Sequence, residues 1–410
     1  MRGISKFLVT FAGKKYVEMK RRLVFLCCIM AWGLSLQAKG EGGGPWGLVK
    51  KVGTFLDSLS VSGVDRSYIE APKHPWQILL RGNVNQSDLK LTSKTSHAEE
   101  TFDFLKGDMT WEPRIKTRPA TYLGLWAGYR GYGLGYSWNV GGDKGRILTF
   151  GVTGGRYGVN LRIHWFDTDE PQVGFTGTGL MAIAEDGSPI YSPFNYNDKI
   201  DMNSPIKMRA LFLDGYYLFN GKKCSYAAAY DQSVVQRRSA GSLMAGAMYF
   251  HSTTHYDDNI NADLIMFMND IGRIKAWQAS AGVGYIYNWV PARGLLISAM
   301  GIPMLTFYNH YKTWRYDSNL KDLIMKEGTS KITEMEEEDY VIRPARKDAV
   351  KSGSSSFKVN FDARLSVTYE WNDRVFMNVF GQFSTFRYSI ENVRTRLNEW
   401  YINAAIGVRL

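Results

Sequence analysis

The sequence predicts an all-β protein: a transmembrane antiparallel up-and-down β-barrel of about 12–14 strands with a short N-terminal periplasmic segment. Three observations lead to this. Polar and apolar residues alternate without interruption over residues 356–371. The stretches 157–165, 277–289 and 400–410 show the same alternation, with aromatic residues at the ends of their apolar faces. Mean hydropathy is only −0.25 although 14% of the residues are aromatic, a combination that suits a barrel, because alternation hides its hydrophobicity from a window average.

Residues 356–371 read S-F-K-V-N-F-D-A-R-L-S-V-T-Y-E-W. Successive side chains of a strand point to opposite faces, so one face is wholly apolar and the other wholly polar. Half-buried strands of soluble proteins seldom keep such a pattern for so long. A membrane-crossing strand needs about 9–11 residues, apolar toward lipid and polar toward a lumen. Tyr369 and Trp371 end the apolar face where an aromatic belt would meet headgroups.

The net charge of +11 is partly a property of the first 38 residues, which hold seven basic residues and one acidic residue. Without them, 43 basic and 38 acidic residues remain, an ordinary balance that gives no reason to expect nucleic acid as a partner. The only long apolar run, residues 23–36, is N-terminal, which excludes a helical membrane protein.

Residues 1–38 have the features of a secretory signal peptide. Basic residues from Met19 onward precede the apolar run, and Ala38 offers a small residue for cleavage. Met19 is a candidate true start. No lipobox precedes Cys27, so we expect no lipid anchor. Cleavage would leave Cys224 as the only cysteine, which excludes an internal disulfide and favours a small packing side chain over a nucleophile.

Residues 39–75 are expected to form the N-terminal periplasmic segment, and residues 76–410 the barrel. Apolar residues recur at helical spacing between Leu48 and Leu59. This predicts a short amphipathic helix that lies on the membrane, plugs the barrel mouth or packs against the barrel end.

Twelve strands are expected from residue 121 onward, and a weaker pair, 76–80 and 109–116, would make fourteen. The twelve are 121–129, 132–140, 147–152, 156–166, 207–219, 224–235, 242–252, 273–289, 295–308, 356–371, 375–388 and 399–410.

Counting back from a periplasmic C-terminus tests these strands. The short turns 290–294 and 372–373 fall on the periplasmic side and the long segments 253–272, 309–355 and 389–397 fall outside, as outer-membrane barrels require. The segment 167–206 is long yet falls on the periplasmic side. Either it folds inward or one strand is miscounted.

The polar face of residues 356–371 is expected to line the lumen. The candidate lumen-lining residues are Lys358, Asp362, Arg364, Glu370 and, from another strand, Arg162. A narrow interior favours charges that pair across it and hold the barrel together over a permeation path.

The sequence offers no catalytic, cofactor or metal site. His251 and His255 would converge on a metal only in a helix, and they are expected at the end of a strand. The pairs His251–Ser252 and His164–Ser137 are the only Ser/His combinations for a lipid-modifying enzyme, and neither has a diagnostic spacing. Carboxylates at 334–339 would either hold divalent cations that bridge lipopolysaccharide or belong to a solvated external loop.

Two further motifs carry a resemblance. Residues 64–72, V-D-R-S-Y-I-E-A-P, are followed by Trp76, and residues 223–232, K-C-S-Y-A-A-A-Y-D-Q, lead to Q-R-R-S-A-G-S at 236–242. Together they resemble an uncharacterised domain-of-unknown-function family of exported Gram-negative proteins that are predicted outer-membrane β-barrels. The resemblance implies location and fold but no activity.

The last part of the second motif, residues 236–242, is expected to form a tight turn between two strands. Gln236, Arg237, Arg238 and Ser239 make up this turn motif. Its arginines would either meet anionic headgroups or dock the N-terminal segment.

The sequence therefore predicts an exported outer-membrane barrel that is structural or passes solutes passively, in the manner of a porin, through a charge-lined lumen. The alternatives are a lipid-modifying barrel enzyme and a soluble periplasmic β-protein that binds an apolar ligand. The expected partners are outer-membrane lipid, lipopolysaccharide and, through the apolar C-terminal strand, the barrel-assembly machinery.

Overall fold

The computed structural model describes residues 63–96, 105–169, 171–199, 202, 204–256, 268, 270–319, 341–345, 350–354, 357–390 and 393–410. These residues belong to the second of two compact units, Leu59–Leu410. The predicted signal peptide with its cleavage at Ala38, the predicted amphipathic helix and the carboxylates at 334–339 lie outside the described residues.

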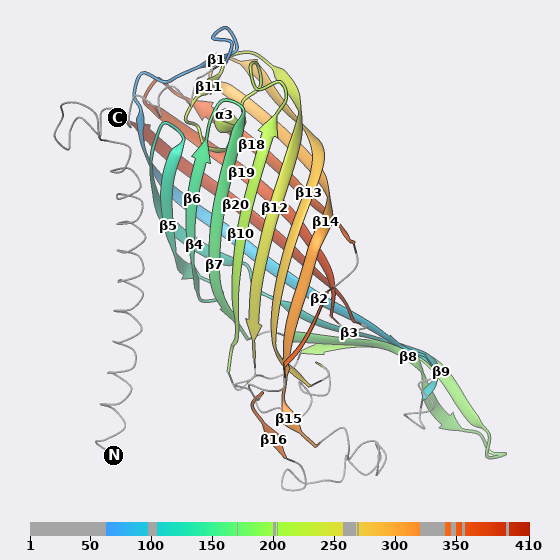
Figure 1. Cartoon of the computed structure of the whole chain (residues 1–410). Helices are drawn as coiled ribbons and strands as arrows, with labels where there is room; N and C mark the ends of the chain where they lie inside the picture. The colour runs from blue at the N-terminus through green and yellow to red at the C-terminus, as the bar shows by residue number, and fades with distance from the viewer. Residues whose placement is uncertain are drawn as a thin grey trace, which may run out of the picture. The chain divides into compact units, whose positions relative to one another are not determined.

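The unit is built on a 16-stranded antiparallel sheet that closes on itself, because its strands β2 and β20 pair with each other (Figure 1). Four of its strands, β3, β8, β9 and β17, branch off, and the other twelve form the closed ring. This confirms the predicted antiparallel up-and-down barrel and gives it the lower of the expected strand numbers.

The ring strands follow one another in sequence order around the barrel. They are β2 (Trp76–Thr95), β4 (Ala120–Tyr129), β5 (Tyr132–Gly141), β6 (Gly145–Thr153), β7 (Tyr157–Thr168), β10 (Ile206–Leu218), β12 (Ala240–His255), β13 (Ile271–Ala292), β14 (Leu295–Arg315), β18 (Val359–Glu370), β19 (Val375–Ile390) and β20 (Val393–Arg409).

A three-stranded arm leaves the ring at one end (Figure 1). The first half of β2 pairs with β4, and its second half pairs with β3 (Leu105–Lys116). Strand β8 (Pro171–Ile183) pairs with β3, and β9 (Pro189–Lys199) pairs with β8. The segment expected as a second barrel strand, 109–116, is therefore part of the arm. Strand β17 (Val350–Ser354) extends β14 at the same end.

The prediction of a strand at 224–235 is wrong. These residues contain a short helix, α3 (Tyr226–Tyr230), and the two-residue strand β11 (Val235–Gln236). Ser225 caps the helix by accepting from the Ala228 N–H at 3.2 Å, and an alanine run follows it, which favours helix over strand.

The strand wrongly expected at 224–235 explains why the long segment 167–206 was assigned to the periplasmic side. When that strand is removed, the connection between β7 and β10 lies at the same end as the connections after β12, β14 and β19, which we call the arm end. The short turns after β4, β6, β13 and β18 lie at the opposite end, which we call the plug end.

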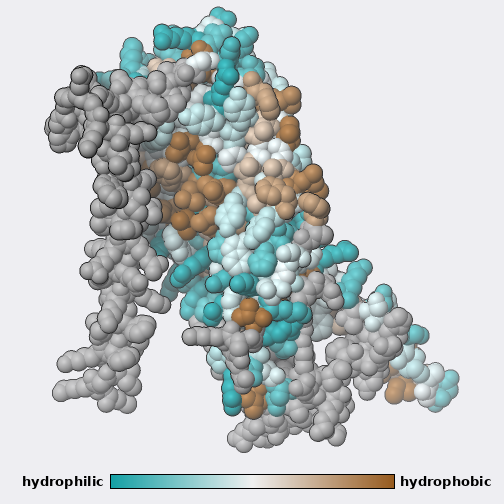
Figure 2. Space-filling model, viewed as in Figure 1, coloured by the Kyte–Doolittle hydropathy of each residue, from teal (hydrophilic) through white to brown (hydrophobic). Residues whose placement is uncertain are grey.

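Burial on the ring strands is the reverse of that in a soluble protein. On β18 the apolar residues Leu365 and Phe361 are 57% and 41% exposed, whereas the polar Ser366 and Asp362 are 1% exposed. Hydrophobic side chains gather at mid-height on the wall seen in Figure 2, between more hydrophilic regions above and below. The outward face is therefore the apolar one. No helix in the described part of the chain is both long and apolar enough to cross a membrane.

Candidate functional site

Residues 219–239, between β10 and β12, form a plug inside one end of the ring. They contain α3 and β11, and every residue from Cys224 to Gln236 is buried. Residues 223–232 of the second motif therefore form the core of the plug, and the turn expected at 236–242 leads from the plug into β12 and does not join two barrel strands. A chain segment placed inside a barrel needs partners for its backbone groups, because a buried unpaired carbonyl is costly.

The ring supplies those partners from several strands. The Ala229 carbonyl accepts from Ser366 Oγ of β18 at 2.6 Å and from Asn378 Nδ2 of β19 at 3.1 Å. The Gln232 carbonyl accepts from Gln77 Nε2 of β2 at 2.7 Å. These side chains lie on the inward faces of their strands, so the plug is fastened to the wall by polar residues.

Charged groups add to this fastening at the C-terminal strand. Arg409 Nη2 donates to the Gln232 carbonyl at 3.1 Å and pairs with Glu370 Oε1 at 2.7 Å. Glu370, a predicted lumen residue, therefore lies at the plug end and ties β18 to β20.

The predicted turn motif joins the plug to the N-terminal segment. Strand β1 (Ile69–Glu70) pairs with β11, and Arg237 Nε lies 2.6 Å from Glu70 Oε2. The Arg238 guanidinium lies 5.7 Å from the centre of the Tyr68 ring. The two arginines were expected either to meet anionic headgroups or to dock the N-terminal segment, and in the structure both contact the N-terminal segment.

The other two residues of the motif also have defined partners. Gln236 is buried, accepts from the Ser225 N–H at 3.0 Å and donates to the Lys223 carbonyl at 2.6 Å. Ser239 Oγ accepts from the Val290 N–H at 2.9 Å, which connects the end of the plug to β13.

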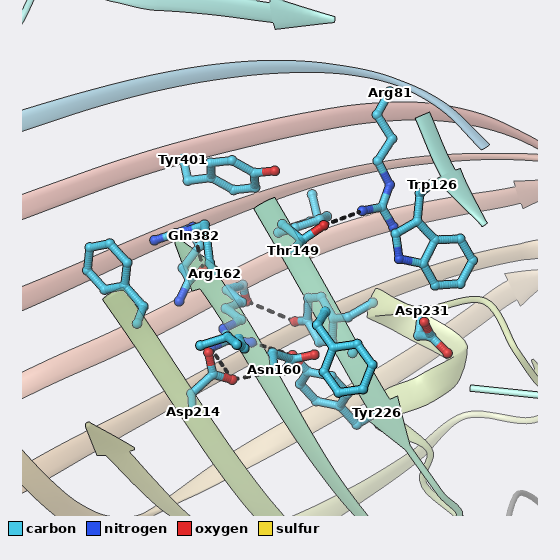
Figure 3. Close-up of a pocket in the computed structure, with 17 residues that line it drawn as sticks. Arg81, Trp126, Thr149, Asn160, Arg162, Asp214, Tyr226, Asp231, Gln382 and Tyr401 are labelled. Carbon is cyan, nitrogen blue, oxygen red and sulfur yellow. Dashed lines mark hydrogen bonds and ion pairs between the residues drawn. The ribbon is translucent and has the colours of Figure 1, made fainter. Parts of the chain in front are cut away.

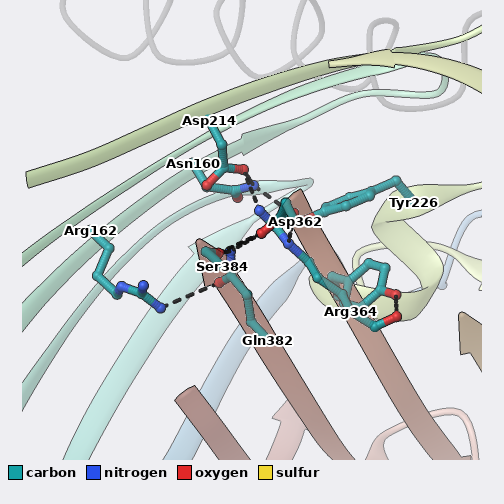
Figure 4. A network of polar contacts seen from close by, with 9 residues as sticks. Asn160, Arg162, Asp214, Tyr226, Asp362, Arg364, Gln382 and Ser384 are labelled. Carbon is teal, nitrogen blue, oxygen red and sulfur yellow. Dashed lines mark hydrogen bonds and ion pairs between the residues drawn. The ribbon is translucent and has the colours of Figure 1, made fainter. Parts of the chain in front are cut away.

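A buried ion network lies against α3 (Figure 4). The Arg364 guanidinium donates through Nε to Asp362 Oδ2 at 3.0 Å, and its Nη2 lies 3.0 Å from Asp214 Oδ2 of β10. Its Nη1 donates to the Tyr226 hydroxyl of α3. Asn160 of β7 donates to the same Asp214 oxygen at 2.9 Å. One arginine thus joins β18, β10 and the plug.

The second oxygen of Asp362 extends the network to β19. It accepts from Gln382 Nε2 at 2.8 Å and from Ser384 Oγ at 2.7 Å. Arg162 of β7 donates to Gln382 Oε1 at 3.3 Å. Four of the predicted lumen residues, Asp362, Arg364, Glu370 and Arg162, are therefore inside the ring. Lys358 is half-buried just before β18 and takes no part in the network.

A cavity of about 90 Å³ lies beside this network, bordered by α3 and ring strands (Figure 3). Arg81 reaches it from β2, with its guanidinium 4.9 Å from the centre of the Trp126 ring. Arg162 reaches it with its guanidinium 4.6 Å from the rings of Phe212 and Tyr401. The Nε atoms of Arg81 and Arg162 have no hydrogen-bond partner among the described residues. The cavity suits water or a small anion and is far below the size of a typical ligand pocket.

Two titratable groups of the plug are shifted by this environment. Burial raises the pKa of Asp231, and the Thr153 hydroxyl, which donates to it at 2.7 Å, opposes that shift. Burial raises the pKa of the Cys224 thiol to about 12. A thiol with that pKa is protonated at neutral pH, which suits the packing role expected for Cys224 and not a nucleophile.

The interior nearer the arm end contains an aromatic cluster, which the polar face of β18 did not predict, beside buried polar side chains of β12 and β13. Phe250 and Phe386 stack with ring centres 4.2 Å apart, and Phe212 lies 5.3 Å from Phe250. The inward methionines of β14 and its Ile302, at 2% exposure, join the same cluster. The interior therefore holds ion pairs beside the plug, and both apolar and buried polar side chains beyond it.

None of the candidate catalytic or metal pairs is assembled. His164 Nε2 lies 3.0 Å from the Tyr122 hydroxyl, and Ser137 Oγ accepts from Asn83, so His164 and Ser137 do not pair. His251 and Ser252 are neighbours on β12 and face opposite sides. His251 and His255 are four strand residues apart, about 13 Å, which is too far for one metal.

Both sequence motifs lie within the part of the chain that matches a known family. A model of the family described as "Domain of unknown function (DUF4421)" matches residues 63–409. The chain belongs to the DUF4421 family. This confirms the resemblance carried by the two motifs, one of which forms the plug and the other the segment docked on it. No curated protein matches this DUF4421 chain.

Solved structures that resemble this DUF4421 chain do so only distantly. The outer membrane protease OmpT from Escherichia coli has a TM-score of 0.32 and 8% identity, over 82% of this chain and 97% of that chain. The β domain of the Bordetella autotransporter BrkA has a TM-score of 0.26 and 9% identity, over 80% and 99%. For the outer membrane protein OprG from Pseudomonas aeruginosa the values are 0.25 and 10%, over 84% and 98%.

Replacing Arg364 with methionine should strongly destabilise the protein. The change keeps much of the side-chain volume but leaves Asp214 and Asp362 buried without their cation, which costs about 3–5 kcal/mol. Urea unfolding followed by tryptophan fluorescence measures the loss. The control is Arg374→Met in the exposed turn after β18, expected to change stability by less than about 0.5 kcal/mol. Equal stability of the two variants would show that the ion pairs of Arg364 do not stabilise the fold.

Cys224 should resist alkylation in the folded protein. Its thiol is buried and has a pKa of about 12, so the reactive thiolate is scarce at pH 8. Maleimide labelling of the Cys224 peptide, measured by mass spectrometry, should be slow before unfolding and rapid in urea. An exposed thiol introduced by Ser352→Cys provides the reference rate. Labelling of Cys224 at that same rate in the folded state would contradict the buried plug.

Proposed function

We propose that this protein is an outer-membrane β-barrel with a structural role, closed by its plug, that holds the arm of β3, β8 and β9 outside the membrane. The observation that carries the proposal is the reversed burial of the ring strands. Leu365 is 57% exposed while its neighbour Ser366 is 1% exposed. Large apolar side chains left exposed over a whole wall are unfavourable in water and favourable against lipid.

The height of the apolar face supports a membrane location. Strand β20 alternates outward apolar residues from Trp400 to Val408, followed by Leu410. Ten strand steps cover about 33 Å, or about 25 Å along the axis of a barrel whose strands tilt by about 40°. That matches the apolar band of an outer-membrane barrel.

Aromatic side chains lie at both ends of this face. At the plug end, Tyr369 and Trp371 contact each other with ring centres 5.5 Å apart, and both are exposed. Toward the arm end, Phe383 and Trp400 lie 4.2 Å apart. Aromatic residues with this placement favour the interfaces between hydrocarbon and headgroups.

The two ends of the ring support an orientation. The plug end has the short turns after β4, β6, β13 and β18, which is typical of the periplasmic side. The arm end has the long connections, so we place it outside the cell. The apolar strand β20 remains the expected contact for the barrel-assembly machinery.

The filled interior favours a structural barrel over an open passage. The plug is hydrogen-bonded to β2, β18 and β19 at one level, and the cluster of Phe212, Phe250 and Phe386 occupies the next. Passive transport of solutes would require the plug to move. No hydrogen-bonded Ser–His pair among the described residues supports the enzyme alternative, and the exposed apolar wall is unfavourable for the soluble one.

The unmodified protein should need detergent and should show little steady conductance in a planar bilayer. Ser366→Ala combined with Asn378→Ala removes two donors to the Ala229 carbonyl and should loosen the plug and increase the frequency of channel openings. The matched control is Ser192→Ala with Asn195→Ala in β9 of the arm. A large steady conductance of the unmodified protein would replace the structural role with passive transport. A monomer that is soluble without detergent would end the membrane proposal.

An arginine at Leu365 tests which face meets lipid. The outward position near the middle of β18 should make Leu365→Arg cost about 2–4 kcal/mol, because a cation would lie at the centre of the bilayer. Folding titrations into phosphatidylcholine vesicles measure it. Glu185→Arg, in the exposed turn of the arm, should have little effect. If arginine at Leu365 and arginine at Glu185 cost the same free energy of folding, Leu365 does not face lipid.

A further inference from the structure

Basic residues follow the apolar face on the outward side of the ring, toward the arm end. Lys275 of β13 and Lys312 of β14 are directly opposite each other in the register of the two strands. Thr253 of β12 is opposite Lys275 on its other side, and Arg209 of β10 is opposite Thr253. These three cations therefore lie in one row across four neighbouring strands.

A second row lies on β19, β20 and β2. Arg387 is opposite Arg396, and Arg396 is opposite Lys90. Lys90 pairs with Glu112 of the arm at 2.8 Å, whereas Arg396 Nε donates to the neutral amide of Asn398 at 2.8 Å. One carboxylate thus faces three cations in this row.

Such rows are unfavourable for the sheet by itself. Side chains directly opposite on neighbouring strands are about 5 Å apart, and like charges in that arrangement repel. Arg209, Lys275 and Lys312 have no ion pair with another described residue. The repulsion within each row falls when an anion binds between the cations.

The position of the two rows relative to the apolar face indicates which kind of anion binds them. Trp277, on the outward face of β13, is two residues from Lys275, about 7 Å along the strand. Lys275 Nζ lies 5.2 Å from the ring of Trp314, and Arg146 lies 5.0 Å from the ring of Trp165. Tryptophan beside basic side chains at the edge of an apolar band is typical of the headgroup layer.

We infer that these two rows, the basic girdle of Arg209, Lys275, Lys312, Arg387, Arg396 and Lys90, bind the phosphate groups of lipid headgroups in the leaflet at the arm end. The inference rests on the proposed membrane location. Arginine and lysine form short, charge-assisted bonds with phosphate oxygens, and cations on neighbouring strands can share one phosphate. The occupant is a phosphorylated lipid whose chains lie against the apolar wall, so the headgroup and the chains are recognised together.

The test compares lipid binding by the folded full-length protein in detergent, using native mass spectrometry. The probe is bisphosphorylated lipid A, with phosphatidylcholine as the neutral reference. The triple variant Arg209→Gln, Lys275→Gln, Lys312→Gln should bind lipid A about a hundredfold more weakly, since each basic residue near an anionic lipid surface contributes about fivefold. The control Lys222→Gln, Arg293→Gln, Arg374→Gln removes the same charge from exposed sites at the plug end and should leave binding unchanged.

Three results would overturn the inference. They are equal binding by the two triple variants, equal binding of lipid A and phosphatidylcholine, and displacement of lipid A by inorganic phosphate at equal concentration, which would indicate a site for the free anion. Insertion into phosphatidylcholine vesicles is measured separately. A protein that inserts but shows no headgroup preference refutes only the girdle, and one that does not insert refutes the proposed location first.

Discussion

The buried guanidinium of Arg364 is the interaction on which the inside of the barrel depends. It lies 3.0 Å from carboxylate oxygens of Asp362 and Asp214, and it donates to Tyr226 of the plug. A cation in a water-poor interior is tolerated only when opposite charge and hydrogen bonds replace its hydration. Here these replacements come from β18, β10 and α3, so the charge is satisfied only when the sheet is curved enough to bring β18 and β10 together across the interior and the plug is in place. Curvature of the wall and placement of the plug are therefore coupled through one side chain.

Most ring strands could be predicted from the sequence because their residues alternate between an apolar outward face and an inward face. On β13, β18 and β20, the residues that alternate in the sequence alternate between exposed and buried in the structure. Only residues 76–80 of β2 were predicted as a strand. Beyond Leu80 the outward residues of β2 include Gln86, Asp88 and Lys90, which lie past the apolar face in the region of the arm. The inward residues Asn83, Asn85 and Ser87 are polar as well, so this part of the strand has little alternation to detect.

The candidate site was harder to predict because its contacts join distant parts of the chain. The polar inward face of β18 was evident, and Asp362 and Arg364 do lie inside the ring. Their partners Asp214 and Tyr226 are more than a hundred residues away. The short apolar run Tyr226–Tyr230 in the plug is compatible with a strand as well as a helix, although Ser225 just before it is a helix-start signal. The aromatic cluster of the interior is formed by inward residues of β10, β12 and β19, and the direction of those side chains depends on strand register.

The pairing of β2 with β20 also has a consequence for how the chain folds. Trp76 and Leu410 exchange backbone hydrogen bonds of 3.2 and 2.9 Å, so the first and last strands of the ring are neighbours in space. Loop-closure entropy must be overcome before such a contact forms, which slows folding. Until it forms, the sheet has two open edges that can pair with other chains. The ring is then an aggregation-prone sheet, and a protein of this kind gains from a chaperone or catalyst that shields both edges until they meet.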